Sequence, residues 1–209
     1  LGRRLAARPE GATYPYSFAV IDYREINAFA LPGGPIWLHR GVLQAAANES
    51  QVAGLLAHEV AHIAQRHSAE QLTKATVTNW GLGLLGAVLG NNAGASAAQT
   101  AAGLLANGPF LKFSGDDERE ADDVGLRIMR RAGWDPRGMT GLFEVLRREA
   151  NRNPSSVETF FSSHPSPQDR IVRLQKQIGR NPGGRRDTPG FQAIKARLRK
   201  LPPPKAMPQ

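Results

Sequence analysis

The chain has 209 residues, which is enough for one domain with appendages and a substantial buried core. Hydrophobic residues make up 41% and charged residues 22%, which excludes a chain that is disordered throughout and a protein with many membrane spans. Cysteine is absent, so disulfide scaffolds, cysteine-ligated zinc fingers, iron–sulfur sites and thiol nucleophiles are excluded.

The net charge of +9 originates at the C-terminal end. Residues 1–170 hold 17 Lys/Arg and 17 Asp/Glu, whereas residues 171–209 hold 10 Lys/Arg and one acid, Asp187. Such a basic tail suits anionic lipid or nucleic acid, and a solvated surface helix is the simpler alternative. Phe191 is the only aromatic residue in it, which argues against stacking on nucleic acid. Because the chain begins at Leu1 without Met, we expect a processed or truncated product whose targeting segment lies outside it.

The N-terminal third predicts a small sheet. Residues 1–15 are typical of a polar lead-in, and the apolar run 18–21 predicts a buried strand. Two further apolar runs, 26–31 and 36–38, flank a Pro-Gly-Gly-Pro turn and predict a hairpin-like pair. We expect His39 to face outward from its strand, and residues 41–47 to form a short helix.

Helical patterns dominate the rest of the chain. Asn48-Glu49-Ser50 offers capping chemistry for a helix that is predicted to run from Gln51 past His67. Further helices are predicted at 116–131, 140–150, from a Ser166-Pro167 start to Ile178, and at 191–201, followed by a disordered proline-containing end.

Residues 75–111 contain no charged residue over 37 positions and are rich in Gly and Ala. Neither of the two apolar patches within this segment reaches the ~18 unbroken apolar residues of a spanning helix. Three interpretations stay open for the segment: a membrane-surface or re-entrant element, a flap over a cleft, and a pair of packed small-residue helices.

The most informative motif is His58-Glu59-Val60-Ala61-His62. Positions four apart lie on one face of a helix, so both imidazoles can bind one metal ion, for which zinc is the natural guest. Glu59 lies beside His58 and is placed to act as general base on the attacking water. The alternative is two structural histidines beside a salt-bridged Glu. The motif lies in an apolar stretch, where unpaired His and Glu would be costly to bury.

A catalytic zinc site needs a third protein ligand. In the predicted helix 116–131, Glu118 and Asp122 are in phase with the apolar face, so we assign Glu118 as the ligand. Asp122, one turn on, then accepts the N–H of a ligating histidine. Glu120 is the rival ligand and is out of phase, and a surface helix with charge pairs is the alternative interpretation.

Three further polar residues are candidates. His67 lies about 140° around a continuous helix from His62, so we interpret it as a flanking residue and not a ligand. His164, in a His-Pro loop, is either a transition-state donor or a reversible fourth ligand, and Arg170 either braces that loop or binds a carbonyl or carboxylate. A turn histidine and a surface arginine are the alternatives.

These motifs resemble, in their order along the chain, a family of zinc metallopeptidases that includes HtpX, the CAAX-prenyl endoprotease and the periplasmic enzymes of the BepA type. Four stretches over residues 15–180 carry the resemblance. They are the Asn27-Ala28-Phe29-Ala30-Leu31-Pro32-Gly33-Gly34 stretch, the motif at 58–62, residues 118–122, and His164-Pro165 with Arg170-Ile171.

The resemblance implies a zincin-like α+β fold, mainly helical, with a small sheet beside the active-site helix. The predicted organisation is a peptidase domain over 1–180, with 75–111 as an insertion, followed by a basic tail over 181–209. The resemblance also implies one zinc ion, held by His58, His62 and Glu118. The strand at Asn27, Ala28 and Phe29 would pair with an extended substrate, and His164 would cap the zinc in a resting state.

The predicted function is zinc-dependent endopeptidase activity on polypeptides, in protein quality control. By resemblance, the protein is expected in a bacterial envelope, in the periplasm or at a membrane. Contact with a membrane surface is expected through 75–111 or the basic tail. The alternative is a latent, His164-capped zinc protein that binds unfolded proteins. A nucleic-acid-associated protease is a weaker alternative.

Overall fold

A three-stranded sheet and helices around one central helix make up the part of the chain that the computed structural model describes, residues 1–7, 10–71, 73–74, 112–165, 168–180 and 182–208. The α+β class predicted from the sequence is confirmed. The elements are β1 (Ser17–Ile21), β2 (Ala28–Ala30), β3 (Pro35–His39), α1 (Gly2–Ala6), α2 (Arg40–Ala45), α3 (Glu49–Ala64), α6 (Gly115–Arg131), α7 (Arg137–Arg152), η1 (Pro154–Ser156), α8 (Glu158–Ser163), α9 (Gln168–Ile178) and α10 (Pro189–Lys200). The uncharged segment 75–111 lies outside the described residues, so its three interpretations stay open.

The sheet has the order β1-β3-β2, which leaves β2 at an edge. β2 and β3 pair antiparallel with Phe29 opposite Trp37, as expected for the hairpin-like pair, and β1 pairs parallel with β3. The turn between β2 and β3 needs glycine, because Gly33 and Gly34 have φ values of 92° and 117°. A Cβ on Gly34 would also lie 2.9 Å from the carbonyl oxygen of Pro15.

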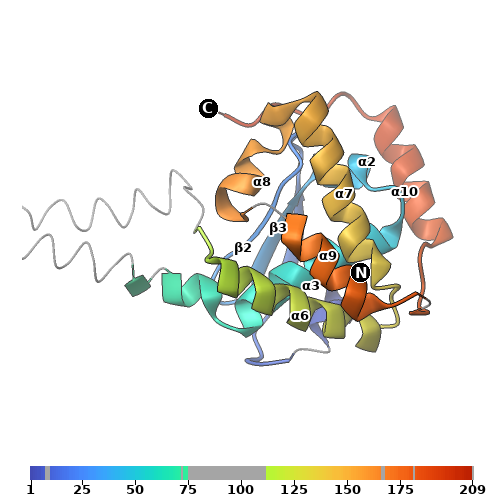
Figure 1. Cartoon of the computed structure of the whole chain (residues 1–209). Helices are drawn as coiled ribbons and strands as arrows, with labels where there is room; N and C mark the ends of the chain where they lie inside the picture. The colour runs from blue at the N-terminus through green and yellow to red at the C-terminus, as the bar shows by residue number, and fades with distance from the viewer. Residues whose placement is uncertain (8–9, 72, 75–111, 166–167, 181, 209) are drawn as a thin grey trace, which may run out of the picture.

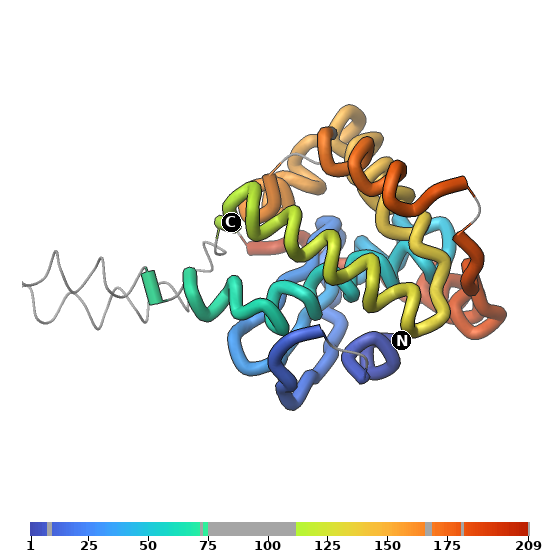
Figure 2. Tube along the Cα trace, turned by 60° about the horizontal axis from the view of Figure 1, so that its bottom comes forward, coloured from blue at the N-terminus to red at the C-terminus, as the bar shows by residue number. Residues whose placement is uncertain are grey.

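Helix α3 is the centre of the molecule. Every residue from Ser50 to Ala64 is buried, which is the pattern of a helix covered on all sides. The Asn48 side chain caps its start by accepting from the Gln51 backbone N–H at 3.3 Å. Helices α1, α6 and α7 and the sheet cover it, and α6 lies alongside it in both views (Figures 1 and 2).

Small residues allow these helices to approach closely. A Cβ on Gly125 of α6 would lie 3.2 Å from the carbonyl oxygen of Ala57 in α3. A Cβ on Gly138 of α7 would lie 2.1 Å from the carbonyl oxygen of Ser50. Helices α6 and α7 are therefore held at short distance from α3, and side chains from α3 and α6 can meet.

Two expectations for the sheet were wrong. β1 was predicted to be buried, but it is an edge strand and Val20 is 57% exposed. His39 was predicted to face outward, but it is 1% exposed. It ends the central strand and is followed directly by α2, so its side chain is enclosed, with its ring 5.2 Å from that of Tyr23.

The two ends of the chain are also more ordered than predicted. Residues 2–6 form α1, whose Leu5 is fully buried, and are not a mere lead-in. The predicted last helix is present as α10, with Thr188 as its cap and Phe191 in the core. Beyond it, the chain is not a disordered tail, because the carbonyl oxygen of Lys205 accepts from the Arg24 N–H at 2.8 Å. Within the described residues, no helix combines the length and the apolar character needed to cross a bilayer.

Candidate metal centre

Four buried side chains from three parts of the chain converge beside α3. His58 and His62 come from α3, Glu118 from α6, and His164 from the residue that ends α8. One donor atom from each lies within 4.8 Å of the others, and each residue is at most 1% exposed. The structure therefore brings together the three predicted ligands, with His164 beside them.

The spacing of the donor atoms fits a zinc ion. The Nε2 atoms of His58 and His62 are 3.0 Å apart, and the nearest Glu118 oxygens lie 3.2 Å from His62 Nε2 and 3.5 Å from His58 Nε2. Tetrahedral zinc with bonds of ~2.0–2.1 Å requires donors about 3.3 Å apart. Two imidazoles and a carboxylate are also a donor set that zinc prefers, so these residues suit the ion.

Asp122 and Arg170 stand behind the donors. Asp122 Oδ1 lies 3.2 Å from His58 Nδ1, the nitrogen that faces away from the donor cluster. Arg170 makes a two-pronged contact to Asp122, at 2.8 Å from Nε and 2.7 Å from Nη2, and also pairs with Glu118. The geometry corresponds to the predicted position of Asp122, and it gives Arg170 contacts with two of the buried acids.

Glu59 lies next to the cluster without joining it. It is 1% exposed, and its Oε1 has no hydrogen-bond partner among the described residues. This oxygen lies 3.6 Å from the Nε2 atom of His164. An unsatisfied buried carboxylate is costly, so its placement indicates a functional role for Glu59.

Aromatic rings enclose the cluster. The ring of Phe113 stacks on His62 with centroids 3.9 Å apart, and Phe160 stacks on His164 at 4.8 Å. A backbone hydrogen bond from Phe113 N–H to the Ser163 carbonyl oxygen, 3.1 Å long, ties the start of α6 to the end of α8. Sequence reasoning did not identify these phenylalanines, because no spacing rule links them to the motif.

The charges in the cluster are strongly coupled. Burial alone would lower the pKa of His58, but the carboxylates of Glu118 and Asp122 raise it to about 9. Burial, and then the proximity of His58, lowers the pKa of His62. Burial raises the pKa of Glu59, opposed by His164 and His58. For Asp122, burial acts upward, but hydrogen bonds from Arg170 and His58 lower the pKa to about 2.

His67 occupies an unexpected place, whereas Glu120 lies outside the donor group, as its phase predicted. The predicted helix past His67 is wrong: α3 ends at Ala64, and Arg66 has a left-handed φ of 66°. His67 is outside the group of four donors, but its Nδ1 lies 3.0 Å from Nδ1 of His62. Glu120, the rival ligand, points away from the donor group, with its Oε2 3.3 Å from His67 Nε2.

The predicted substrate strand lies against the same central helix. Asn27 precedes β2, while Ala28 and Phe29 belong to it, and β2 packs against α3. Asn27 is 1% exposed, and both polar atoms of its side chain lack a hydrogen bond within the part of the chain that is described. The arrangement puts an edge strand next to the helix that carries the histidines.

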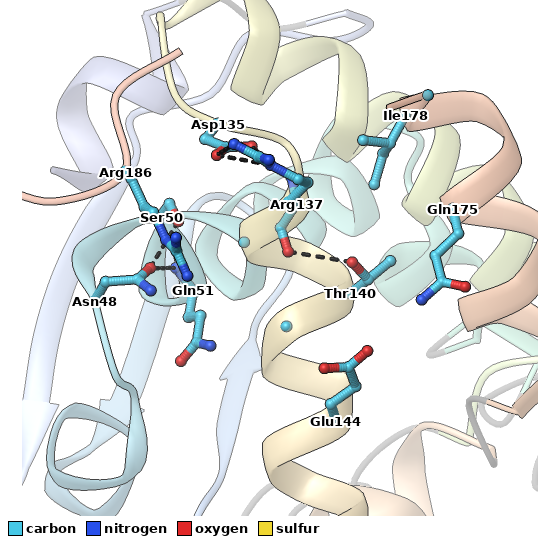
Figure 3. Close-up of a pocket in the computed structure, with 13 residues that line it drawn as sticks. Asn48, Ser50, Gln51, Asp135, Arg137, Thr140, Glu144, Gln175, Ile178 and Arg186 are labelled. Atoms are coloured by element: carbon cyan, nitrogen blue, oxygen red, sulfur yellow. Dashed lines mark hydrogen bonds and ion pairs between the residues drawn. The ribbon is translucent and has the colours of Figure 1, made fainter. Parts of the chain in front are cut away.

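A cavity of about 360 Å³ lies elsewhere, at the N-terminal ends of α3 and α7 (Figure 3). Its charged residues carry both signs: Asp135 and Glu144 face it together with Arg137 and Arg186. None of the four converging donors lines it. The candidate site is therefore the buried cluster and not this cavity.

Comparison with known proteins gives a family match. A family model described as Peptidase family M48 matches residues 1–178. The chain is 35% identical over 178 residues to the Beta-barrel assembly-enhancing protease of Escherichia coli, a match that covers 82% of this chain and 36% of that protein.

Two further relatives are metallopeptidases by name. The chain is 37% identical over 157 residues to the Mitochondrial metalloendopeptidase OMA1 of Saccharomyces cerevisiae, covering 73% of this chain and 43% of the relative. It is 27% identical over 165 residues to the Metalloprotease YcaL of Escherichia coli, covering 78% and 63%. The chain thus spans between about a third and two thirds of the length of these relatives.

Proposed function

This chain belongs to peptidase family M48, and we propose that it is a zinc-dependent endopeptidase that hydrolyses peptide bonds in polypeptide substrates. One observation carries the proposal: His58, His62 and Glu118 converge in a buried cluster, with Glu59 beside them. We propose these three residues as the zinc ligands and Glu59 as the general base. Asp122 fixes the ring of His58 through its Nδ1 atom.

The chemistry follows from these positions. Zinc, when bound, polarises the scissile carbonyl and lowers the pKa of the attacking water from ~15.7 to ~7. Glu59 takes a proton from that water and delivers it to the leaving amine. Burial, which raises the pKa of Glu59, makes its carboxylate a stronger base than an exposed glutamate.

The substrate is proposed to bind as an added strand. β2 is an edge of the described sheet and packs against α3, so an extended peptide that pairs with Asn27, Ala28 and Phe29 would lie beside the histidines. Arg170, which contacts both Glu118 and Asp122, holds the acidic side of the site in place. Its proposed role is therefore positioning.

Replacing Glu59 tests the proposal. Glu59→Gln keeps the shape of the side chain and removes the base, so we expect unchanged zinc stoichiometry and a loss of casein cleavage of at least ~10²–10⁴-fold. Glu144→Gln, the same change on α7 away from the cluster, is the matched control and should cleave at the wild-type rate. Wild-type cleavage by Glu59→Gln would show that the base assignment is wrong.

A second candidate is a latent protein that binds unfolded polypeptides. The observation in its favour is that His164 Nδ1 lies 2.7 Å from Glu118 Oε1 and 3.4 Å from His58 Nε2, beside the ligand set, where it can cap the zinc. If His164 keeps the protein in an inactive state, His164→Ala should cleave casein faster than wild type. If His164 instead assists the reaction, the same variant should be slower.

We further propose that the protein acts in the bacterial envelope. The support is its likeness to a relative named for enhancing beta-barrel assembly. The basic last turn of α10, with Arg197, Arg199 and Lys200, suits contact with anionic lipid. Cell fractionation with a periplasmic marker tests the location, and co-sedimentation with anionic vesicles tests the contact.

A further inference from the structure

The two histidines of the motif are supported in different ways. Behind His58 lies a buried carboxylate, because Asp122 Oδ1 is 3.2 Å from His58 Nδ1. Behind His62 there is no carboxylate in contact with Nδ1 among the described residues, and the ring of His67 takes that place, with the two Nδ1 atoms 3.0 Å apart. His67 is 4% exposed, so water does not compete freely for this contact.

The backbone explains how His67 comes to be there. α3 ends at Ala64, and the left-handed conformation of Arg66 turns the chain before helical residues 67–71 begin. In a continuous helix, His67 would point about 140° away from His62. The turn cancels that rotation and stores backbone strain, since a residue other than glycine seldom adopts a φ of 66°.

The hydrogen positions follow from the chemistry of the ligand. A His62 that offers Nε2 to a metal carries its proton on Nδ1, so it must donate to His67 Nδ1. His67 Nδ1 is then the acceptor, and the proton of that ring lies on Nε2. Nε2 is 3.3 Å from Glu120 Oε2, which accepts it. One set of tautomers satisfies every contact in the row His62–His67–Glu120.

We propose that His67 and Glu120 are positioning residues that orient His62 as a zinc ligand. The inference rests on the proposed function, since it takes His62 as a ligand. The stacking of Phe113 on His62 restrains the face of the ring, while His67 fixes its rotation in the plane. Glu120, whose side chain is 55% exposed, acts one step further out by fixing the tautomer of His67.

Zinc affinity is the measurement that tests this role. The dissociation constant is determined by competition with a chromophoric chelator, using the full chain at fixed pH. His67→Leu removes the acceptor but keeps the bulk, so zinc should bind ~10–100-fold more weakly. His67→Asn presents an oxygen at the position of Nδ1 and should stay within a few-fold of wild type. The visible spectrum of the cobalt-substituted protein should change in His67→Leu and return in His67→Asn.

The outcomes separate this inference from the proposed function. If wild type binds no zinc at the cluster, the proposed function itself is wrong. If wild type binds zinc and His67→Leu binds it equally well, only the role of His67 is overturned. An equal loss in His67→Leu and His67→Asn would also overturn it, because the acceptor would then be irrelevant.

A second pair of variants lies at an exposed position, where folding is not at risk. Glu120→Gln keeps an acceptor for His67 Nε2 and should bind zinc as wild type does. Glu120→Leu removes the acceptor and should weaken binding several-fold, by less than His67→Leu. Identical zinc affinities for the two Glu120 variants would show that Glu120 does not help to position His67.

Discussion

Glu118 and Glu120 are two residues apart, yet their surroundings differ completely. Glu118 is 1% exposed and has His62, His164 and Arg170 around it, whereas the side chain of Glu120 is 55% exposed. Burial by itself raises the pKa of Glu118, but the neighbouring His164 and His58 lower it well below the usual range. The surroundings of Glu118 thus favour its ionised form, which is the form that binds a metal ion.

Removing Glu118 should therefore abolish the metal site. We expect the zinc affinity of Glu118→Ala to fall by more than the ~10–100-fold that is typical when a partner of a ligating residue is removed. The measurement is zinc content after gel filtration, together with the dissociation constant. Asp116→Ala, at an acid of the same helix whose side chain is 87% exposed, is the matched control and should bind zinc as wild type does. If Glu118→Ala still binds one zinc per chain, another residue must be the third ligand.

The same contrast shows what can be predicted at the scale of residues. Phase along one regular helix was sufficient to separate Glu118 and Asp122 from Glu120, because all three lie on α6. The same reasoning mispredicted the direction of His67, because the helix ends before it and the chain turns at Arg66. An arginine gives no sequence signal for a left-handed backbone conformation. The contacts of Phe113 and Phe160 depend on tertiary packing alone.

At the scale of elements, α7 begins with a charged arrangement that faces the cavity of Figure 3. The Asp135 carboxylate accepts from the backbone N–H of Arg137 at 3.0 Å and from its guanidinium at 2.6–3.0 Å. Burial raises the pKa of Asp135, but these hydrogen bonds outweigh it and lower the pKa below its usual value. The folded protein therefore favours the ionised form of Asp135.

The lowered pKa of Asp135 determines the direction in which the stability of the protein changes with pH. The unfolded chain protonates Asp135 near pH ~4, so its stabilising effect is complete above this pH and is lost as the pH falls further, through the folded pKa. Asp135→Asn keeps the acceptor for the backbone and loses the charge. The difference in unfolding free energy between wild type and this variant should be constant from pH 5 to 7. It should become smaller as the pH falls below 4.

Urea unfolding at a series of pH values measures this difference. Asp135→Ala, which also removes the acceptor for the helix start, should lose a further ~1–2 kcal/mol at pH 7. The prediction fails if the gap between wild type and Asp135→Asn is as wide at pH 3 as at pH 7.

The elements themselves were largely predictable. Apolar patterns and capping residues located α3, α6, α7 and α9 to within a few residues, because helices of this length carry strong signals. The exposure of β1 was not predictable, since an apolar run looks the same in an edge strand and in a central one. α1 was missed because five residues are too few for a periodic signal.

At the scale of the whole molecule, the basic C-terminal segment is bound to the N-terminal third. Ser50 N–H donates to the Arg186 carbonyl oxygen at 2.9 Å, and Lys205 N–H donates to the Asp22 carbonyl oxygen at 3.0 Å. The prolines at 202–204 predicted a disordered end for this segment. A buried arginine from the N-terminal third helps to hold the segment in place, and composition alone could not identify this contact.

That arginine is Arg40, which is 4% exposed. Its guanidinium donates to the carbonyl oxygens of Leu198 at 2.7 Å and Pro202 at 2.9 Å, and pairs with Asp22 at 2.9 Å. Leu198 lies in the last turn of α10, where its carbonyl oxygen also accepts from the Leu201 N–H at 3.4 Å. Arg40 thus fastens α10 and the segment after it to the body of the molecule.

Replacing Arg40 by methionine should release this segment. Arg40→Met keeps most of the side-chain length but removes the buried guanidinium and its hydrogen bonds to two carbonyl oxygens, so we expect a loss of about 2–4 kcal/mol in unfolding free energy. Trypsin should also cut faster after Lys195, Arg197 and Arg199 than in wild type, because local opening exposes these sites. Arg24→Met, at a side chain that is 67% exposed and paired with Glu25, is the control and should change stability by less than ~0.5 kcal/mol. Equal rates of cleavage in Arg40→Met and wild type would show that the backbone contacts at Asp22 and Arg24 hold the segment without Arg40.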